Sequence, residues 1–188
     1  MAEGKAIPYG AYEIGEDRAV VNVGETHDTA EFAVESIGRW WKLSGSKRKQ
    51  GAKRILICAD SGGSNSSRSR TWKLQLRQLA DELGMAIAVC HYPPGTSKWN
   101  KIEHRLFSFI SITWKGQPPI NFETVVNPIG ATKTKSGLKV KAVLDTNKYE
   151  TGVKVTKLQM DALRIREHKT HPNWNYTLKP RRNFAWQF

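Results

Sequence analysis

Two short apolar runs alternate with two amphipathic segments in the middle of the chain, and this succession is the strongest constraint on the fold. The runs "RILICAD" and "MAIAVCHY" have the length and composition of strands that are buried on both faces of a parallel sheet. Between them, "TWKLQLRQLADELG" has helical periodicity, and Gly84 suits its end. A second helix is predicted over "KWNKIEHRLFSFISITW", with Ser97 as its N-cap. The order strand, helix, strand, helix predicts parallel pairing with right-handed crossovers and therefore an α/β fold.

The flanking segments add elements of both kinds. The stretch "AIPYGAYEIGEDRAVVNVG" predicts two antiparallel strands joined near "GEDR", and "TAEFAVESIGRWWKL" predicts a helix capped by Asp28 or Thr29. The run "SGSKRKQGAKR" is expected to be a solvated basic loop. After Gly116, the segments "NFETVVNPIG" and "TKLQMDALRI" suggest helices and "LKVKAVLD" a strand. The tail "HKTHPNWNYTLKPRRNF" mixes aromatic residues with cations, which suits docking onto the domain or onto nucleic acid.

Charge and length limit the class of protein. The 188 residues suit one domain, and 30 lysines and arginines against 17 acids give a net charge of +13. A basic globular domain favours a polyanionic partner, most often nucleic acid, although charge alone does not separate DNA, RNA and an anionic membrane surface. Cys58 and Cys90 lie in apolar runs and are expected to be buried thiols. Without an apolar membrane span or a signal peptide, we expect a cytoplasmic, nucleoid-associated protein.

Two acids occupy positions at which such folds bind ligands. Asp60 ends the first apolar run, and ligands of open parallel sheets bind beyond the carboxyl ends of the strands, although a lone aspartate there equally serves a loop or a helix cap. By its spacing, Glu103 shares a helical face with Trp99, Leu106 and Ile110, where a carboxylate is costly unless it is paired or bound to a cation. Together the two acids favour a hard ion such as Mg²⁺. Two such ions, about 3.5 to 4 Å apart, activate an attacking oxygen and stabilise a leaving one during phosphodiester cleavage or transfer.

Other motifs are weaker. The loop "SGGSNSSRSR" resembles a phosphate cradle but lacks the Gly-Lys-Ser/Thr ending of a P-loop. The histidines have no metal-ligand spacing, although His91 and His104 flank the expected site.

Long stretches of the sequence resemble one known family. The segment "ILICADSGGSNSSRSRTWKLQLRQLADELGMAIAVCHYPPGTSKWNKIEHRLFSFIS" closely resembles the catalytic core of the Rhodopirellula-type (ISAzo group) DDE transposases of bacterial insertion sequences. The likeness continues through "NPIGATKTKSGLKVKAVLDTNKYETGVKV" and "HPNWNYTLKPR". Asn100, Ile102 and Glu103 also match the shorter "SP-x-LN-x-IE" signature of mariner-type transposases.

The resemblance implies a ribonuclease H-like mixed sheet flanked by helices. It also implies Mg²⁺ or Mn²⁺ held by three acids, hydrolysis at transposon ends, and strand transfer into target DNA by a complex that can be homo-oligomeric. Asp60 matches the second acid and Glu103 the last, which makes both of them expected catalytic residues and metal ligands. The residues expected near DNA are Arg68, Arg70, Lys98, Asn100 and Lys101.

The likeness also implies a difference from the family. Relatives carry a first strand with the first catalytic Asp before the segment matched by "KAIPYGAYEI", and this sequence begins at that segment. None of Glu13, Asp17, Asp28 and Asp145 is expected to end a buried strand and replace that acid. We therefore expect residues 1–188 to form a single, N-terminally truncated catalytic domain, with 117–188 as its C-terminal extension, that is inactive alone. Two alternatives stay open: a non-catalytic nucleic-acid-binding remnant, and a ribonuclease H-like nuclease with another substrate.

Overall fold

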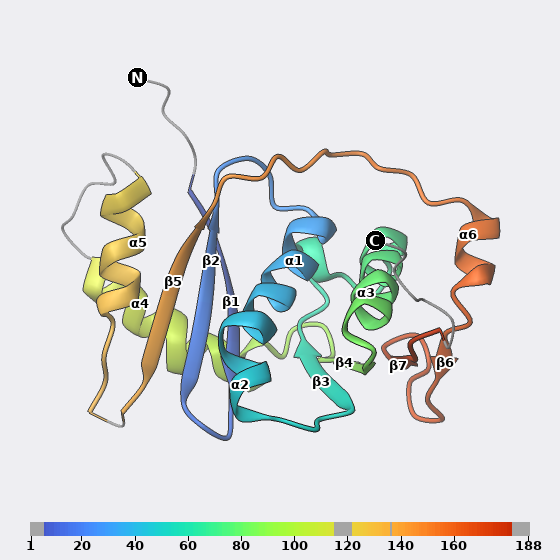
Figure 1. Cartoon of the computed structure of the whole chain (residues 1–188), viewed down its shortest axis with the longest axis horizontal. Helices are drawn as coiled ribbons and strands as arrows, with labels where there is room; N and C mark the ends of the chain where they lie inside the picture. The colour runs from blue at the N-terminus through green and yellow to red at the C-terminus, as the bar shows by residue number, and fades with distance from the viewer. Residues whose placement is uncertain (1–5, 115–121, 136, 182–188) are drawn as a thin grey trace.

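The computed structural model describes residues 6–114, 122–135 and 137–181, and their strands form two separate sheets (Figure 1). In the first sheet, β1 (Ile7–Glu13) pairs antiparallel with β2 (Arg18–Gly24), and β2 pairs parallel with β5 (Lys139–Asp145). The predicted front strands and the strand over "LKVKAVLD" are thereby confirmed. Because β2 is the central strand, nearly all of it is buried.

The second sheet contains the predicted parallel pair. β3 (Arg54–Ala59) and β4 (Ala86–His91) run parallel, joined by the crossover helix α3 (Arg70–Leu83), which ends at Gly84 with a φ of 63°. The sheet continues from β4 through β7 (Asn175–Leu178) to β6 (Arg166–Glu167), both antiparallel to their neighbours. The tail therefore docks onto the domain, which was one of its two predicted roles. The fold is α/β, with two mixed sheets flanked by helices.

Helix α1 (Ala30–Trp40) lies between the first sheet and α3 (Figure 1). Of the two possible caps, Thr29 is the one used: its Oγ1 accepts a hydrogen bond from the backbone N–H of Phe32 at 3.2 Å. The helix continues through the π-turn η1 (Trp41–Gly45) into α2 (Ser46–Arg48). The prediction of a solvated loop from Ser44 was therefore wrong at its beginning, where Arg48 pairs with Glu13 and Glu16.

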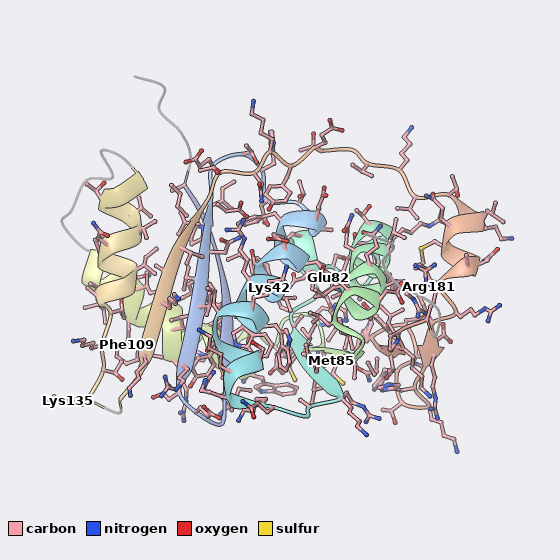
Figure 2. All side chains as sticks on the ribbon, in the orientation of Figure 1. Lys42, Glu82, Met85, Phe109, Lys135 and Arg181 are labelled. Carbon is pink, nitrogen blue, oxygen red and sulfur yellow. The ribbon has the colours of Figure 1, made fainter. Side chains whose placement is uncertain are left out.

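Salt bridges attach the flanking segments to α3. Lys42 Nζ lies 2.9 Å from Glu82 Oε1, which ties η1 to α3 (Figure 2). At the tail, Arg181 Nη2 lies 2.6 Å from Asp81 Oδ2, and the backbone N–H of Arg181 donates to the same carboxylate at 2.7 Å. These contacts hold α1, α3 and the tail together around the second sheet.

The remaining helices pack around the edges of the fold. The two predicted late helices are confirmed as α5 and α6, and the latter begins with a capping box between Thr156 and Gln159. The bounds of the remaining elements are η2 (Gly63–Asn65), η3 (Ser97–Trp99), η4 (Glu103–Phe107), α4 (Ser108–Trp114), α5 (Phe122–Ala131) and α6 (Lys157–Ala162).

Two hydrophobic cores follow from this arrangement. One joins α1 and α3 to the second sheet, with Trp72, Leu76 and Tyr176 at its centre. The other joins the first sheet to η4, α4 and α5, with Leu106 and Ile129 among its buried side chains. Within the described ranges, no helix is long and apolar enough to cross a membrane.

Strand β3 differs from the prediction that it is buried on both faces. Leu56 is 63% exposed and Cys58 is exposed, whereas Ile55 and Ala59 on the opposite face are buried. Helix α4, which could have covered this face, packs with α5 and the first sheet instead. The expectation that Cys58 is a buried thiol was therefore wrong. It lies opposite Cys90 in the parallel register, and both cysteines are free.

Candidate functional site

A cavity of about 720 Å³ lies between the two sheets. One wall is residues 7–14, which are β1 and the residue after it, and the other is residues 55–60, which are most of β3 and the residue after it. The segment that follows the proline corner contributes Asn100–Glu103 and Phe107. Asp60 and Glu103, which are separated in the sequence by helix α3 and strand β4, therefore line the same cavity.

Asp60 owes its position to the end of β3 and to the loop that follows. The backbone turns through Gly62 and Gly63, and the latter has a φ of 57°, in the region that favours glycine. The loop ends where Ser69 Oγ caps α3 by accepting a hydrogen bond from the Trp72 N–H at 3.1 Å. This leaves the Asp60 carboxylate half-buried at the rim of the cavity.

Glu103 is placed by a close contact between its helix and β1. A Cβ on Gly10 would lie only 3.0 Å from Leu106 and 3.1 Å from Ile102, so the absence of a side chain allows η4 to lie directly on the strand. Residues 103–107 form a π-turn, which has one residue more per turn than an α-helix. As a result, Leu106 and Ile110 are buried while Glu103 is exposed. The prediction that Glu103 lies on the apolar face was wrong, because its side chain is exposed. Trp99, which was expected on the same face, is also 53% exposed.

Ser97, the predicted N-cap of this helix, is separated from it by a non-helical residue, Asn100. Ser97 belongs to the short 3₁₀ turn η3, and helical structure resumes at Lys101. The side chain of Ser97 lies outside the described part of the structure.

Two further residues line the cavity: Tyr9, which the sequence did not single out, and Asp28, which was considered as a helix cap and set aside as a replacement for the first catalytic Asp. Tyr9, on β1, has a hydroxyl whose pKa is raised well above its usual value of 10, first by burial and then by the negative charges of Asp60 and Asp28. Asp28, just before α1, also lines the cavity. Nothing in their local sequence distinguishes them, because only the pairing of distant segments brings them to Asp60.

The donor set suits a hard divalent cation. Among the described residues, no group of three or more His, Cys, Asp and Glu side chains is close enough to hold a metal ion. Mg²⁺, however, commonly takes one or two protein carboxylates and completes its shell with water and phosphate oxygens. The carboxylates that line the cavity, those of Asp60 and Glu103 together with those of Glu13 and Asp28, are oxygen donors of that kind.

The five residues expected near DNA differ in exposure and in whether they line the cavity. Arg68, Lys98 and Lys101 are exposed, and Lys101 lines the cavity. Arg70 is exposed at the start of α3, where its Nη1 donates to the Val155 carbonyl at 3.3 Å. Asn100 is only 9% exposed, but it also lines the cavity. Asn100 and Lys101 thus line the same cavity as the two acids, whereas the three other cations are exposed and lie outside its lining.

His91 connects the cavity loop to the tail. Its Nδ1 lies 2.9 Å from the Trp174 carbonyl and its Nε2 lies 2.9 Å from the Asn65 carbonyl. His104 is exposed, with Nε2 3.1 Å from the Lys98 carbonyl. His91 therefore has a structural position behind the loop that carries Asp60.

One further acid, Asp145, lies outside the cavity lining. It ends β5 and is completely buried, although the other residues of that strand are exposed or only partly buried, so Asp145 does not end a buried strand, as expected. Its carboxylate accepts hydrogen bonds from Arg39 at 2.8 Å, Asn22 at 2.9 Å and Tyr149 at 2.7 Å. These contacts tie β5 to β2 and α1, so Asp145 has a structural role.

Comparison with known proteins identifies the family. The family model described as the Rhodopirellula transposase DDE domain matches residues 1–180. A search of curated proteins and a search of solved structures each returned no match. Because the family match spans nearly the entire sequence, the chain belongs to the Rhodopirellula transposase DDE domain family.

Proposed function

We propose that this chain supplies part of the metal-dependent centre of a DNA transposase, which hydrolyses phosphodiester bonds at the ends of an insertion sequence and transfers the strand to target DNA. The observation that carries the proposal is that Asp60 and Glu103, from distant elements, line one cavity. Membership of a DDE transposase family supports the transposase role in general.

In this proposal the two carboxylates hold Mg²⁺ or Mn²⁺ at the open end of the cavity. When bound, the metal would activate the attacking oxygen and stabilise the leaving one. The Lys101 ammonium, beside Glu103 in the lining, would attract a DNA phosphate into the cavity. The exposed cations Arg68, Arg70 and Lys98 would contact the DNA backbone outside it, which positions the duplex without reading its sequence.

A divalent-ion titration tests the metal site. We expect wild-type protein to bind Mn²⁺ and Asp60→Asn to bind it at least about tenfold more weakly, a difference of about 1.4 kcal/mol. The matched control is Asp161→Asn, because Asp161 is exposed on α6 and does not line the cavity. Equal Mn²⁺ affinity in wild type and Asp60→Asn would contradict the assignment.

The second candidate is non-catalytic nucleic-acid binding. It is favoured by the absence of a three-member ligand group among the residues that the structure describes. Its signature is DNA binding without nicking at any protein concentration in Mn²⁺. A ribonuclease H-like nuclease would instead cleave an RNA–DNA hybrid in preference to transposon-end DNA. The two substrates, assayed side by side, separate these functions.

A further inference from the structure

Cations gather at the end of the molecule where β2, β3 and β5 begin. Three segments meet there: the turn between β1 and β2, the stretch from α2 to the start of β3, and the connection that precedes β5 (Figure 1). The connection contacts the turn because the Lys139 N–H donates to the Asp17 carbonyl at 3.1 Å. The turn contacts the stretch before β3 because Glu16 pairs with Arg48 and Lys49. The three segments therefore form one continuous surface.

The acids on this surface already have partners. Glu13 pairs with Arg48, and Glu16 pairs with Arg48 and Lys49. The carboxylate of Asp17 accepts a hydrogen bond from a tyrosine hydroxyl at 2.7 Å. These acids are therefore neutralised or hydrogen-bonded by groups of the same surface.

Further cations on the three segments are left in excess. All of them are exposed, and none forms a salt bridge with another residue that the structure describes. We call this set the basic band, and its members are Lys47, Lys53, Arg54, Lys133, Lys135 and Lys139. The band therefore offers positive charges, spread over three segments, to an anion that carries many charges.

The basic band is remote from Asp60. Arg54 begins β3 and Asp60 follows its last residue, so the two lie at opposite ends of a six-residue strand. At a rise of about 3.3 Å per residue, the strand separates them by roughly 20 Å. No member of the band lines the cavity that contains Asp60 and Glu103. The band and the cavity are therefore separate places on the molecule.

We propose that the basic band binds the phosphate backbone of a second DNA segment while the first lies at the Asp60 end, so that the chain bridges two duplexes. The proposal rests on the proposed function, which identifies the anion as DNA. Exposed lysines that neutralise phosphates release counterions, and this release drives binding. Contacts of this kind position DNA without reading its sequence.

The stiffness of DNA favours a second segment over a bend in the first. A duplex that contacted both ends of β3 would have to turn around a protein body about 20 Å thick. Bending a site of 20–30 base pairs by 40–90° already costs on the order of 1–6 kcal/mol, and this path requires a larger bend. Two separate segments avoid that cost.

A bridging assay tests the proposal. One duplex is attached to beads, and a fluorescent duplex of the same sequence is retained only when the protein holds both. We expect the wild type to retain the fluorescent duplex. We expect the triple variant Lys47→Gln, Lys53→Gln, Lys135→Gln to retain at least about tenfold less of it, because up to three phosphate contacts are lost. The amount of protein on the beads should change by less than about twofold, since the first duplex binds at the Asp60 end.

Two matched variants control for charge and for folding. Lys148→Gln, Lys154→Gln, Lys157→Gln removes the same charge from exposed positions outside the band and should bridge as the wild type does. Lysine-to-arginine changes at the three band positions keep the charge and should also preserve bridging. Equal losses in the two glutamine variants would overturn the proposal, because general charge would then explain them. Undiminished bridging by the band variant, as when two copies of the chain each hold one duplex, would overturn it as well.

Anionic phospholipid vesicles separate DNA from the other polyanionic surface. If the band substitutions weakened binding to such vesicles but not bridging, the band would be a lipid-binding surface and the proposal would fall. The bridging assay is run in EDTA, so no metal enters it. Equal Mn²⁺ affinity in wild type and Asp60→Asn would contradict the proposed metal site but would leave the bridging result standing.

Discussion

At the scale of single residues, the buried Asp145 network shows how much stability one carboxylate contributes. Arg39, Asn22 and Tyr149 all donate to Asp145, so Asp145→Asn removes the charge that pairs with Arg39 and replaces an acceptor by an amide donor. We expect a loss of about 2–4 kcal/mol in the free energy of unfolding, measured by urea denaturation. Asp161→Asn, at an exposed position, is the control and should change it by less than about 0.5 kcal/mol. A loss below 1 kcal/mol in Asp145→Asn would contradict this account.

Tyr149 in the same network gives a pH dependence. Burial, and then the hydrogen bond to Asp145, raise the pKa of its hydroxyl above the usual 10. The unfolded chain therefore ionises this tyrosine first, so its contribution to stability is complete below pH 10 and falls as pH rises above it. We expect Tyr149→Phe to be less stable than wild type at pH 8 but to lose less stability between pH 9 and 11, measured by urea denaturation at each pH. Equal losses in both proteins would contradict the prediction.

Glu103 illustrates the limit of prediction at this scale. Its place on the apolar face followed from α-helical spacing, but the π-turn at residues 103–107 adds one residue, which rotates the following positions by about 100°. The turn packs on Gly10 of β1, a contact across more than 90 residues that no local pattern contains. Asp60 was simpler to place, because the end of an apolar strand is a local signal.

At the scale of elements, local signals predicted most helices and strands. The two short strands β6 and β7 were not predicted as strands, because they are held by pairing and not by an apolar run: β7 pairs with β4, and β6 pairs with β7. β3 was identified, but its exposed face was not, since burial depends on which helix covers the sheet. The sequence allowed either Asp28 or Thr29 as the N-cap of α1, and in the structure Thr29 is the cap.

The assignment of Thr29 as the N-cap of α1 can be tested by mutation. Thr29→Ala removes the hydrogen bond to the Phe32 N–H and should lower the free energy of unfolding by about 1 kcal/mol. Asp28→Ala, one residue earlier, is the matched control and should cost less than half as much. Chemical denaturation of the two variants under the same conditions checks this; a larger loss in Asp28→Ala would show that the cap is misassigned.

At the scale of the whole molecule, the sequence predicted an α/β fold but not the division of its strands into two sheets. Pairing such as that of β2 with β5, or of β4 with β7, joins segments about 90 or more residues apart, and the order of strands depends on these contacts. The same division produces the cavity that contains Asp60 and Glu103. The fold and the candidate site thus both depend on the pairing of strands that are distant in the sequence, which no local pattern predicts.

The net charge of +13 is also a property of the whole molecule, and it predicts how DNA binding depends on salt. Each phosphate that a cation neutralises steepens the slope of log K against log salt concentration by about 0.9, because counterions are released. If Lys101 contacts a phosphate at the cavity, Lys101→Gln should make the slope shallower by about that amount. Lys157→Gln, at an exposed position on α6 and outside the cavity lining, should leave it unchanged. Fluorescence anisotropy titrations over a range of salt concentrations measure both slopes. Equal slopes in the two variants would mean that DNA binds through the general surface charge of the protein and not at the cavity that Asp60 and Glu103 line.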